Sequence, residues 1–369
     1  MAEPKVAWIG DDERLDDLLD RLSDAEAVYV DTEFVGDRTY VPRLCLIQVA
    51  TPDVVACIDP LAEIDLDPFW DLLADPDVVK VLHAADNDFA LFVGPCDGVP
   101  APLFDTQVAA AFCGHGAQIG YANLVQALCG ETLDKSMQRT DWARRPLSQA
   151  AVRYAAGDVT WLRDVHTALV DELEARGRTG WAAEEFERRC ERSRFADDPA
   201  LAWRRVRGRD RLDPASLAVL AEIASWRESV AKSSNRPRRW VLSDEVCLAA
   251  AQQRPEDADA VRALRGFDPR RHGSHVTPLV QIVRAASRLP ESRWPVLDRP
   301  IDGRESSAVE AMQTAVRAAA DEVGLPPELI ATTDDLLRVA RGDRDVALFS
   351  GWRSEVLGDR LERFRADRR

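Results

Sequence analysis

The chain has 369 residues, of which 46% are hydrophobic, and a formal net charge of −16, so it is long enough for two or three domains with proper cores. Its longest apolar runs are short and broken by charged residues, which excludes a membrane span, and its first residues lack the basic and apolar regions of a signal peptide. The seven cysteines are scattered and form no Cys-x-x-Cys pair, a pattern typical of reduced thiols in a cytoplasmic protein and not of a disulfide framework or a zinc site.

The first part of the chain alternates between helix and strand patterns. Leucines at helical spacing predict a helix over residues 12–23, and a later one begins at Ser148, a suitable N-cap, and runs to about Arg176. Further helices are predicted from about Asp86 and from Tyr121. Short apolar runs predict strands over residues 27–34, 44–49, 54–58 and 78–82. This alternation predicts an α/β domain over residues 1–195.

Strand patterns stop after the charged segment Phe195–Pro199. Helix starts follow at Asp213-Pro214, Ser243 and Thr277-Pro278, which predicts an all-helical domain over residues 205–290. A weak repeat at an offset of 90 residues relates Pro237–Val246 to Pro327–Leu336 and predicts a second, divergent copy over residues 300–369. We expect a truncation near Asp198 to leave a folded first domain.

Charge is distributed unevenly between these domains. Residues 1–100 contain 23 acidic and 6 basic residues, whereas residues 201–300 contain 12 acidic and 19 basic residues. The acidic part is expected to be a solvated surface, and the basic part favours a polyanionic partner.

Two carboxylates, Asp31 and Glu33, stand two residues apart at the end of an apolar strand, so both side chains lie on one face. Adjacent carboxylates repel each other unless a cation lies between them, and a set of oxygen ligands suits Mg²⁺ or Mn²⁺. Taken alone, the pair is equally compatible with a strand that ends in solvent.

Tyr154 and Asp158 lie four residues apart on one face of the helix that begins at Ser148, beside its apolar stripe. Asp88 follows another apolar strand. Each residue has an ordinary alternative, as a boundary tyrosine, a solvated acid or an acid in the first turn of a helix. We interpret His83 as a structural histidine.

The order of these residues resembles that of the DEDD superfamily of 3′→5′ exonucleases. Asp31-Thr32-Glu33-Phe34, the segment from His83 to Asp88, and Tyr154-x-x-x-Asp158 correspond to its three motifs. The likeness is to the tyrosine branch, because the histidine branch has a histidine at the position of Arg153. Phe104-Asp105-Thr106-Gln107 and Leu133–Trp142 resemble ribonuclease D, and Asn235–Val241 resembles the HRDC domain that ribonuclease D shares with RecQ-type helicases.

This resemblance implies a ribonuclease H-like α/β exonuclease domain with a mixed sheet, followed by all-α HRDC-type domains. It implies that two divalent ions, Mg²⁺ or Mn²⁺, bind to Asp31, Glu33, Asp88 and Asp158, and that Tyr154 orients the attacking water. The implied partner is RNA with a free 3′ end, in particular transfer RNA precursors, with no membrane and no obligate protein partner. One departure from the family pattern is Gly157, which costs up to about 1 kcal/mol of helix stability relative to alanine.

Several arginines are candidates for phosphate contacts. They are Arg139, Arg144 and Arg145 in the first domain and Arg236, Arg238 and Arg239 in the basic segment. Trp203 and Trp240 can stack on bases, although tryptophans of this kind are more often core residues.

Three other functions remain open at this point. A 3′→5′ deoxyribonuclease would use the same metal chemistry, and no residue in the sequence can be tied to a ribose 2′-hydroxyl. A non-catalytic RNA-binding scaffold is disfavoured because all five catalytic positions are intact. A helicase accessory module is suggested by the HRDC resemblance, but the chain lacks a Walker-type phosphate-binding motif and is not itself the motor.

Overall fold

The computed structural model describes residues 5–134, 136–137, 139–195, 198–297, 301–362 and 364. Some residues singled out in the sequence lie outside this part of the chain, namely Lys135, Gln138, Ala196, Asp197, Pro300 and residues 365–369. The chain forms two compact units: Met1–Phe34 with Leu44–Phe195 and Ile301–Arg369, and Val35–Arg43 with Ala196–Pro300.

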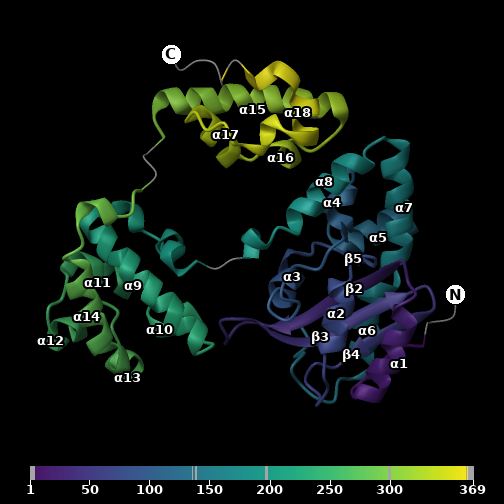
Figure 1. Ribbon diagram of the computed structural model, residues 1–369, viewed down its shortest axis with the longest axis horizontal. Coiled ribbons are helices and arrows are strands. Elements are labelled where there is room, and N and C mark those ends of the chain that lie inside the picture. The colour runs from purple at the N-terminus through teal and green to yellow at the C-terminus, as the bar shows by residue number, and fades with distance from the viewer. Residues whose placement is uncertain are drawn as a thin grey trace. The chain divides into compact units, whose positions relative to one another are not determined.

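The first unit is built on a six-stranded sheet in the order β1-β4-β3-β2-β5-β6 (Figure 1). The pairs β1–β4, β2–β5 and β5–β6 are parallel and β3–β4 is antiparallel, so the sheet is mixed, as predicted. The strands are β1 (Ala7–Ile9), β2 (Ala27–Val35), β3 (Arg43–Thr51), β4 (Val54–Ile58), β5 (Val79–Leu82) and β6 (Leu103–Asp105). The short strands β1 and β6, three residues each, were not predicted, because so few residues show no alternation.

Helices connect and surround these strands. They are α1 (Asp12–Leu22), α2 (Asp67–Ala74), α3 (Asp86–Phe92), α4 (Thr106–Phe112), α5 (Tyr121–Cys129), α6 (Gln149–Thr160), α7 (Leu162–Ala175) and α8 (Thr179–Arg189). The predicted N-cap is confirmed, because Ser148 Oγ accepts from Ala151 N at 3.1 Å. The prediction of one long helix from Ser148 is wrong: the backbone at Trp161 (φ −92°, ψ −8°) interrupts the helical hydrogen bonds, and α7 starts again after it.

The second unit consists of short helices around α9 (Figure 1). Its helices are α9 (Pro214–Ser233), α10 (Arg238–Val241), α11 (Asp244–Gln253), α12 (Ala258–Arg262), α13 (Pro269–His272) and α14 (Val276–Ala286). The caps at Asp213 and Ser243 are as predicted, and α14 begins one residue before the predicted Thr277. None of the helices in the described part of the chain has the length and apolarity that a membrane span needs.

The β2–β3 turn belongs to the second unit, where it contacts α9 and α10. Tyr40 donates its hydroxyl proton to Glu228 Oε1 at 2.6 Å, and the Arg238 guanidinium lies over the Tyr40 ring at 4.7 Å. The Asn235 side chain accepts from the backbone N–H groups of Tyr40 and Val41 at 3.0 and 3.1 Å. The turn is therefore held by a dense set of polar contacts.

The C-terminal helices pack on the α/β part of the same unit. They are α15 (Gly303–Val323), α16 (Pro327–Ile330), α17 (Thr333–Ala340) and α18 (Gly351–Leu357). Trp352 is fully buried, with its ring centroid 5.0 Å from that of Phe112 and 5.8 Å from that of Trp181. Trp352 Nε1 donates to Glu185 Oε1 at 3.0 Å, and Arg353 forms an ion pair with the same carboxylate. One hydrophobic core therefore includes residues from both segments.

This shared core corrects the expectation about truncation. Removing everything after Asp198 would remove α15–α18 and expose the apolar surfaces of α4 and α8 on which Trp352 lies. The remaining fragment would not be an intact domain, so tests of the helical modules need point substitutions in the full chain.

We expect Arg353→Ala to destabilise the protein by about 3 kcal/mol, because it removes the more buried of the two arginines paired with the largely buried Glu185 and leaves only the more exposed Arg188. The matched control is Arg360→Ala, which breaks a more exposed ion pair with Glu322 in the same segment and should cost less than about 1 kcal/mol. Urea unfolding of the full chain measures both, and equal costs would contradict the structural role of the Glu185 contact.

Candidate active site

The predicted catalytic residues meet at one pocket of about 350 Å³ in the first unit. It is lined by Asp31, Thr32, Glu33, His83, Gly120, Tyr121, Ala122, Asn123, Leu133, Asp134, Tyr154, Asp158 and Leu162. Asp88 does not line the pocket but is joined to it, because the Thr32 hydroxyl donates to its carboxylate. The structure thus brings together all four carboxylates and the tyrosine.

Secondary structure accounts for this convergence. Asp31 and Glu33 project from the same face of β2, and Tyr154 and Asp158 lie one turn apart on α6. The ring of Trp142 lies 6.1 Å from that of Tyr154 and restricts its position.

The turn that leads to Asp88 is strained and is held by a residue that the sequence did not identify as functional. Ala84 has a φ of 58°, which is unfavourable for a residue with a side chain. The fully buried carboxylate of Asp105 accepts from the N–H groups of Ala84 and Ala85, both at 3.1 Å, and also caps α4. Asp105 therefore fixes the start of α3, from which Asp88 projects. The resemblance of Phe104-Asp105-Thr106 to ribonuclease D drew attention to Asp105 in the sequence but did not indicate what its carboxylate does.

Burial raises the pKa values of all four carboxylates, and repulsion from the other acids of the cluster adds to the effect at Asp31 and Glu33. Burial raises the pKa of Glu33 to about 8, helped by the charges of Asp158 and Asp88. Burial also raises the pKa of Asp158 to about 7 and that of Asp88 to about 6. The pKa of Asp31 lies well above its usual range, because the group is desolvated and faces the other three acids.

This donor set fits divalent cations. The energetic cost of ionising four clustered, buried carboxylates falls when cations neutralise their charge. Hard oxygen ligands of this kind suit Mg²⁺ and Mn²⁺. In the described part of the chain no three His, Cys, Asp or Glu side chains are close enough together to form a metal site as they stand. The fit therefore rests on the chemistry of the donors.

His83 is structural, in agreement with its interpretation from the sequence. Its Nε2 lies 3.1 Å from the carbonyl of Ile119 and its Nδ1 lies 2.9 Å from Thr106 Oγ1. Burial lowers its pKa, so the ring is neutral at pH 7. His83, which follows β5, thus ties the segment before α5 to the first residue of α4.

Arg145 is not available for phosphate contacts, which corrects the prediction. It binds Asp59 through two hydrogen bonds of 2.7 and 2.6 Å and donates to the carbonyls of Trp142 and Arg144. Arg139 and Arg144 are exposed, so they stay candidates.

Arg238 is likewise a structural residue, because its guanidinium is bound in two hydrogen bonds of 2.6 Å by Glu228 and lies over Tyr40. Arg236 and Arg239 are exposed. The core interpretation is confirmed for Trp203, which is 5% exposed, but is wrong for Trp240, which is 47% exposed.

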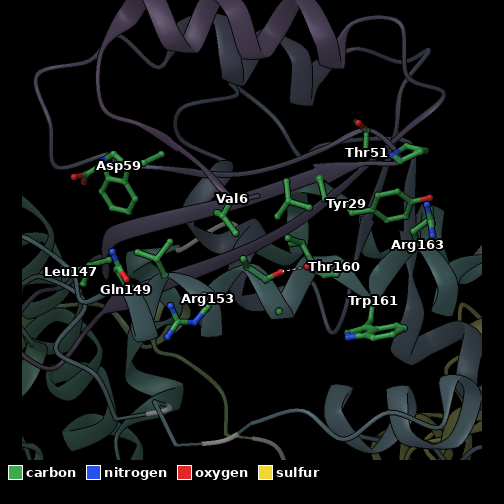
Figure 2. Close-up of a pocket in the computed structure, with 18 of the residues that line it drawn as sticks. Val6, Tyr29, Thr51, Asp59, Leu147, Gln149, Arg153, Thr160, Trp161 and Arg163 are labelled. Atoms are coloured by element: carbon green, nitrogen blue, oxygen red, sulfur yellow. Dashed lines mark hydrogen bonds between the residues drawn. The ribbon is translucent and has the colours of Figure 1, made fainter. Parts of the chain in front are cut away.

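A second, larger cavity of about 1350 Å³ lies on the other side of α6 (Figure 2). In this view Tyr29 and Thr51 come from the sheet, Val6 lies just before β1, and Arg153 and Thr160 come from the helix. None of the four carboxylates lines this cavity, so its size does not make it the catalytic site. It explains why Gly157 is tolerated: a Cβ at this position would meet nothing within 4 Å, so packing does not depend on the residue there.

Comparisons with known proteins place this geometry in context. A family model described as 3′-5′ exonuclease matches residues 6–174, and one described as HRDC domain matches residues 216–283. The chain is 41% identical over 361 residues to the ribonuclease D of Gluconacetobacter diazotrophicus, covering 96% of this chain and 92% of that protein. It is 37% identical to the ribonuclease D of Bartonella henselae, with 92% and 85% covered. The crystal structure of Escherichia coli RNase D, an exoribonuclease involved in structured RNA processing, matches 98% of both chains with a TM-score of 0.89 and 31% identity.

The raised pKa values predict how stability depends on pH when no metal is bound. A carboxylate whose pKa is raised by folding stabilises the protein fully below its ordinary pKa near 4 and loses that contribution as the pH rises through the folded value. With EDTA, these groups should therefore lower the melting temperature progressively from about pH 4, up to about pH 6 for Asp88, about pH 7 for Asp158 and about pH 8 for Glu33, so that a fall remains between pH 6 and pH 8. Saturating Mg²⁺ or Mn²⁺ should remove this fall.

Glu33→Gln should reduce the fall in melting temperature with rising pH in EDTA, because it removes the carboxylate with the pKa at the upper end of the range. Asp53→Asn, at an exposed acid of the same unit, is the control and should leave the fall unchanged. A melting temperature that is flat or rises from pH 6 to 8 in EDTA would contradict the assignment of repulsion to this cluster.

Proposed function

Because the chain belongs to the ribonuclease D family and is a 3′→5′ exoribonuclease, we propose that it trims the 3′ ends of transfer RNA precursors by two-metal-ion hydrolysis that releases nucleoside 5′-monophosphates. Exonucleases of this type depend on a divalent metal. We propose that this site holds two ions, that both are Mg²⁺ or Mn²⁺, and that the individual residues have the roles given below.

The convergence of Asp31, Glu33 and Asp158 with Tyr154 at one pocket, and of Asp88 through Thr32, supports the proposal most directly. These carboxylates are the proposed ligands of the ions. When bound, two divalent ions supply a hydroxide nucleophile and neutralise the charge of the scissile phosphate. The residues themselves hold the cluster in place and remain ionised only when cations offset their repulsion.

Tyr154 positions water in this scheme and does not act as a base. Burial, together with the charges of Asp158, Glu33 and Asp31, raises the pKa of its phenol, which therefore keeps its proton at pH 7. A protonated phenol can still accept and donate a hydrogen bond, and that is enough to hold a water molecule in a fixed direction.

The second unit is the proposed RNA-binding module. Arg236 and Arg239 are exposed beside the exposed ring of Trp240, so one short segment offers two phosphate contacts and a stacking surface. The basic excess of residues 201–300 supports the same role. Incubation of the purified protein with Mg²⁺ and 3′-extended transfer RNA, beside single-stranded DNA, tests the substrate: progressive shortening of the RNA supports the proposal, and shortening of DNA alone contradicts it.

We expect Tyr154→Phe to lower kcat by roughly 10²-fold with little change in RNA affinity, because the variant keeps the ring and loses the hydroxyl that holds water. Asp31→Ala and Asp158→Ala should abolish cleavage while the protein stays folded. Rates on a short oligoribonucleotide, with circular dichroism as the check on folding, measure these effects. Unchanged turnover in Tyr154→Phe would make Tyr154 a packing residue, and activity in either aspartate variant would contradict the metal assignment.

The salt dependence of RNA binding tests the arginines. Each phosphate contact with a single strand contributes roughly 0.7 to the slope of log affinity against log salt, so Arg236→Ala with Arg239→Ala should lower the slope by roughly 1.4. Arg288→Ala, at an exposed arginine of the same unit, is the matched control for a simple change in charge. Arg238→Ala should instead lower stability, because it leaves the buried Glu228 without the two hydrogen bonds that its guanidinium donates. Equal slopes for the double variant and the wild type would exclude this segment as the RNA contact.

A further inference from the structure

Tyr121, the first residue of α5, lines the active-site pocket and carries a hydroxyl that no described residue binds. Its ring lines the pocket together with Asp31, Glu33, Tyr154 and Asp158. Its hydroxyl oxygen is buried and forms no hydrogen bond with any described residue. Buried hydroxyls in folded proteins are almost always hydrogen-bonded, so an unpaired one at the wall of a catalytic pocket indicates a group that is satisfied by a ligand.

The surroundings of Tyr121 determine what kind of ligand group it can bind. Burial and the charges of Asp158 and Asp31 hold the pKa of its phenol well above the usual range, so it is neutral and protonated. The backbone N–H of Trp161 lies near enough to the phenol oxygen to lower its pKa slightly but forms no hydrogen bond of good geometry, and the phenol proton has no acceptor among the described residues. The ring of His83, centred 5.5 Å away, packs against Tyr121, and His83 is itself fixed by Thr106 and the Ile119 carbonyl. The hydroxyl is therefore a rigid, neutral donor and acceptor beside two carboxylates.

We propose that Tyr121 Oη forms a hydrogen bond with the ribose 2′-hydroxyl of the 3′-terminal nucleotide and so makes the site prefer RNA over DNA. This inference rests on the proposed function. A nucleotide in this pocket has three kinds of polar group: phosphate oxygens, base edges and sugar hydroxyls.

The sugar hydroxyl fits Tyr121 best. An anionic phosphate oxygen is disfavoured next to Asp31 and Asp158 except through a cation, whereas a neutral hydroxyl is not. Base edges differ among the four nucleotides, and an enzyme that removes nucleotides one after another needs a contact common to all of them. The 2′-hydroxyl is common to all four, is both donor and acceptor like the phenol, and is the group by which a protein distinguishes RNA from DNA.

The contact can be tested with a double-mutant cycle in which one change is made in the enzyme and the other in the substrate. The substrates are two oligoribonucleotides that differ only in the 2′-hydroxyl of the 3′-terminal nucleotide, and kcat/KM is measured with Mg²⁺ for removal of that nucleotide by the wild type and by Tyr121→Phe. The wild type should lose roughly tenfold in kcat/KM when the hydroxyl is absent, which is the effect of one hydrogen bond. Tyr121→Phe should lose about the same on the all-ribose substrate and nothing more on the deoxy-terminated one.

A purely structural role for Tyr121 would lower both rates equally, and such additive losses would overturn the proposal. Equal rates of the wild type on the two substrates would also overturn it, without any need for the variant to fold. The same cycle in binding affinity, measured without metal so that no hydrolysis occurs, should show the same coupling. Tyr29→Phe is the matched control, because the Tyr29 hydroxyl lies 3.5 Å from His166 Nδ1 at the other cavity, and it should leave the discrimination of the wild type intact.

The outcomes separate the two proposals. If the wild type removes no nucleotide from either oligonucleotide, the proposed function itself fails. If it removes nucleotides but shows additive effects, only the assignment of Tyr121 fails.

Discussion

The burial of four neighbouring carboxylates is the constraint around which the first unit is built. Desolvation raises the pKa values of Asp31, Glu33, Asp88 and Asp158, and repulsion adds to the effect at the first two, so without cations this arrangement is unfavourable and must be imposed by the rest of the fold. A central strand fixes the first pair, and a helix with a serine cap carries Asp158. The third element is the strained turn at Ala84, which persists because the buried Asp105 binds its N–H groups. Strain of this kind is typical of sites where position matters more than stability.

The strand that carries Asp31 and Glu33 also connects the two units. β2 ends at Val35, and the turn that follows it is held by α9 and α10 through Tyr40, Glu228 and Arg238. The proposed metal ligands and the helical module are thus joined by one short, continuous segment of backbone. Arg238, which the sequence suggested as an RNA contact, instead binds Glu228 and lies over the Tyr40 ring, and so holds this turn.

The sequence was sufficient for the parts of the site that follow from periodicity and motif order. Alternation along β2 and the four-residue spacing on α6 predicted which side chains share a face, and the structure agrees. A residue that acts through tertiary hydrogen bonds could not be predicted in this way: Asp105 has no periodic signal, and its role depends on the N–H groups of Ala84 and Ala85 that lie opposite it. The arginines show the same limit. Arg145 and Arg238 are as basic as Arg144 and Arg239, and only the positions of Asp59 and Glu228 reveal that the first two are already bound.

The two helical segments share one pattern of helices but differ in their exposed side chains. The structure corrects the offset from 90 to 89, because α9, α10 and α11 begin at residues 214, 238 and 244, and α15, α16 and α17 begin at 303, 327 and 333. At this offset the N-caps Asp213 and Asp302 coincide, as do Ser243 and Thr332.

The capping positions are thus shared between the two copies, but the exposed side chains just before and within α10 are not. Arg236 corresponds to Leu325, which is buried, Arg239 to Glu328, and Trp240 to Leu329. The second copy has lost the cationic and aromatic side chains that suit a polyanion. It instead packs on the exonuclease region through the segment that contains Trp352. Helix caps and buried apolar positions preserve the fold of such a module, and the few exposed side chains that remain free to change decide whether it contacts RNA or the protein itself.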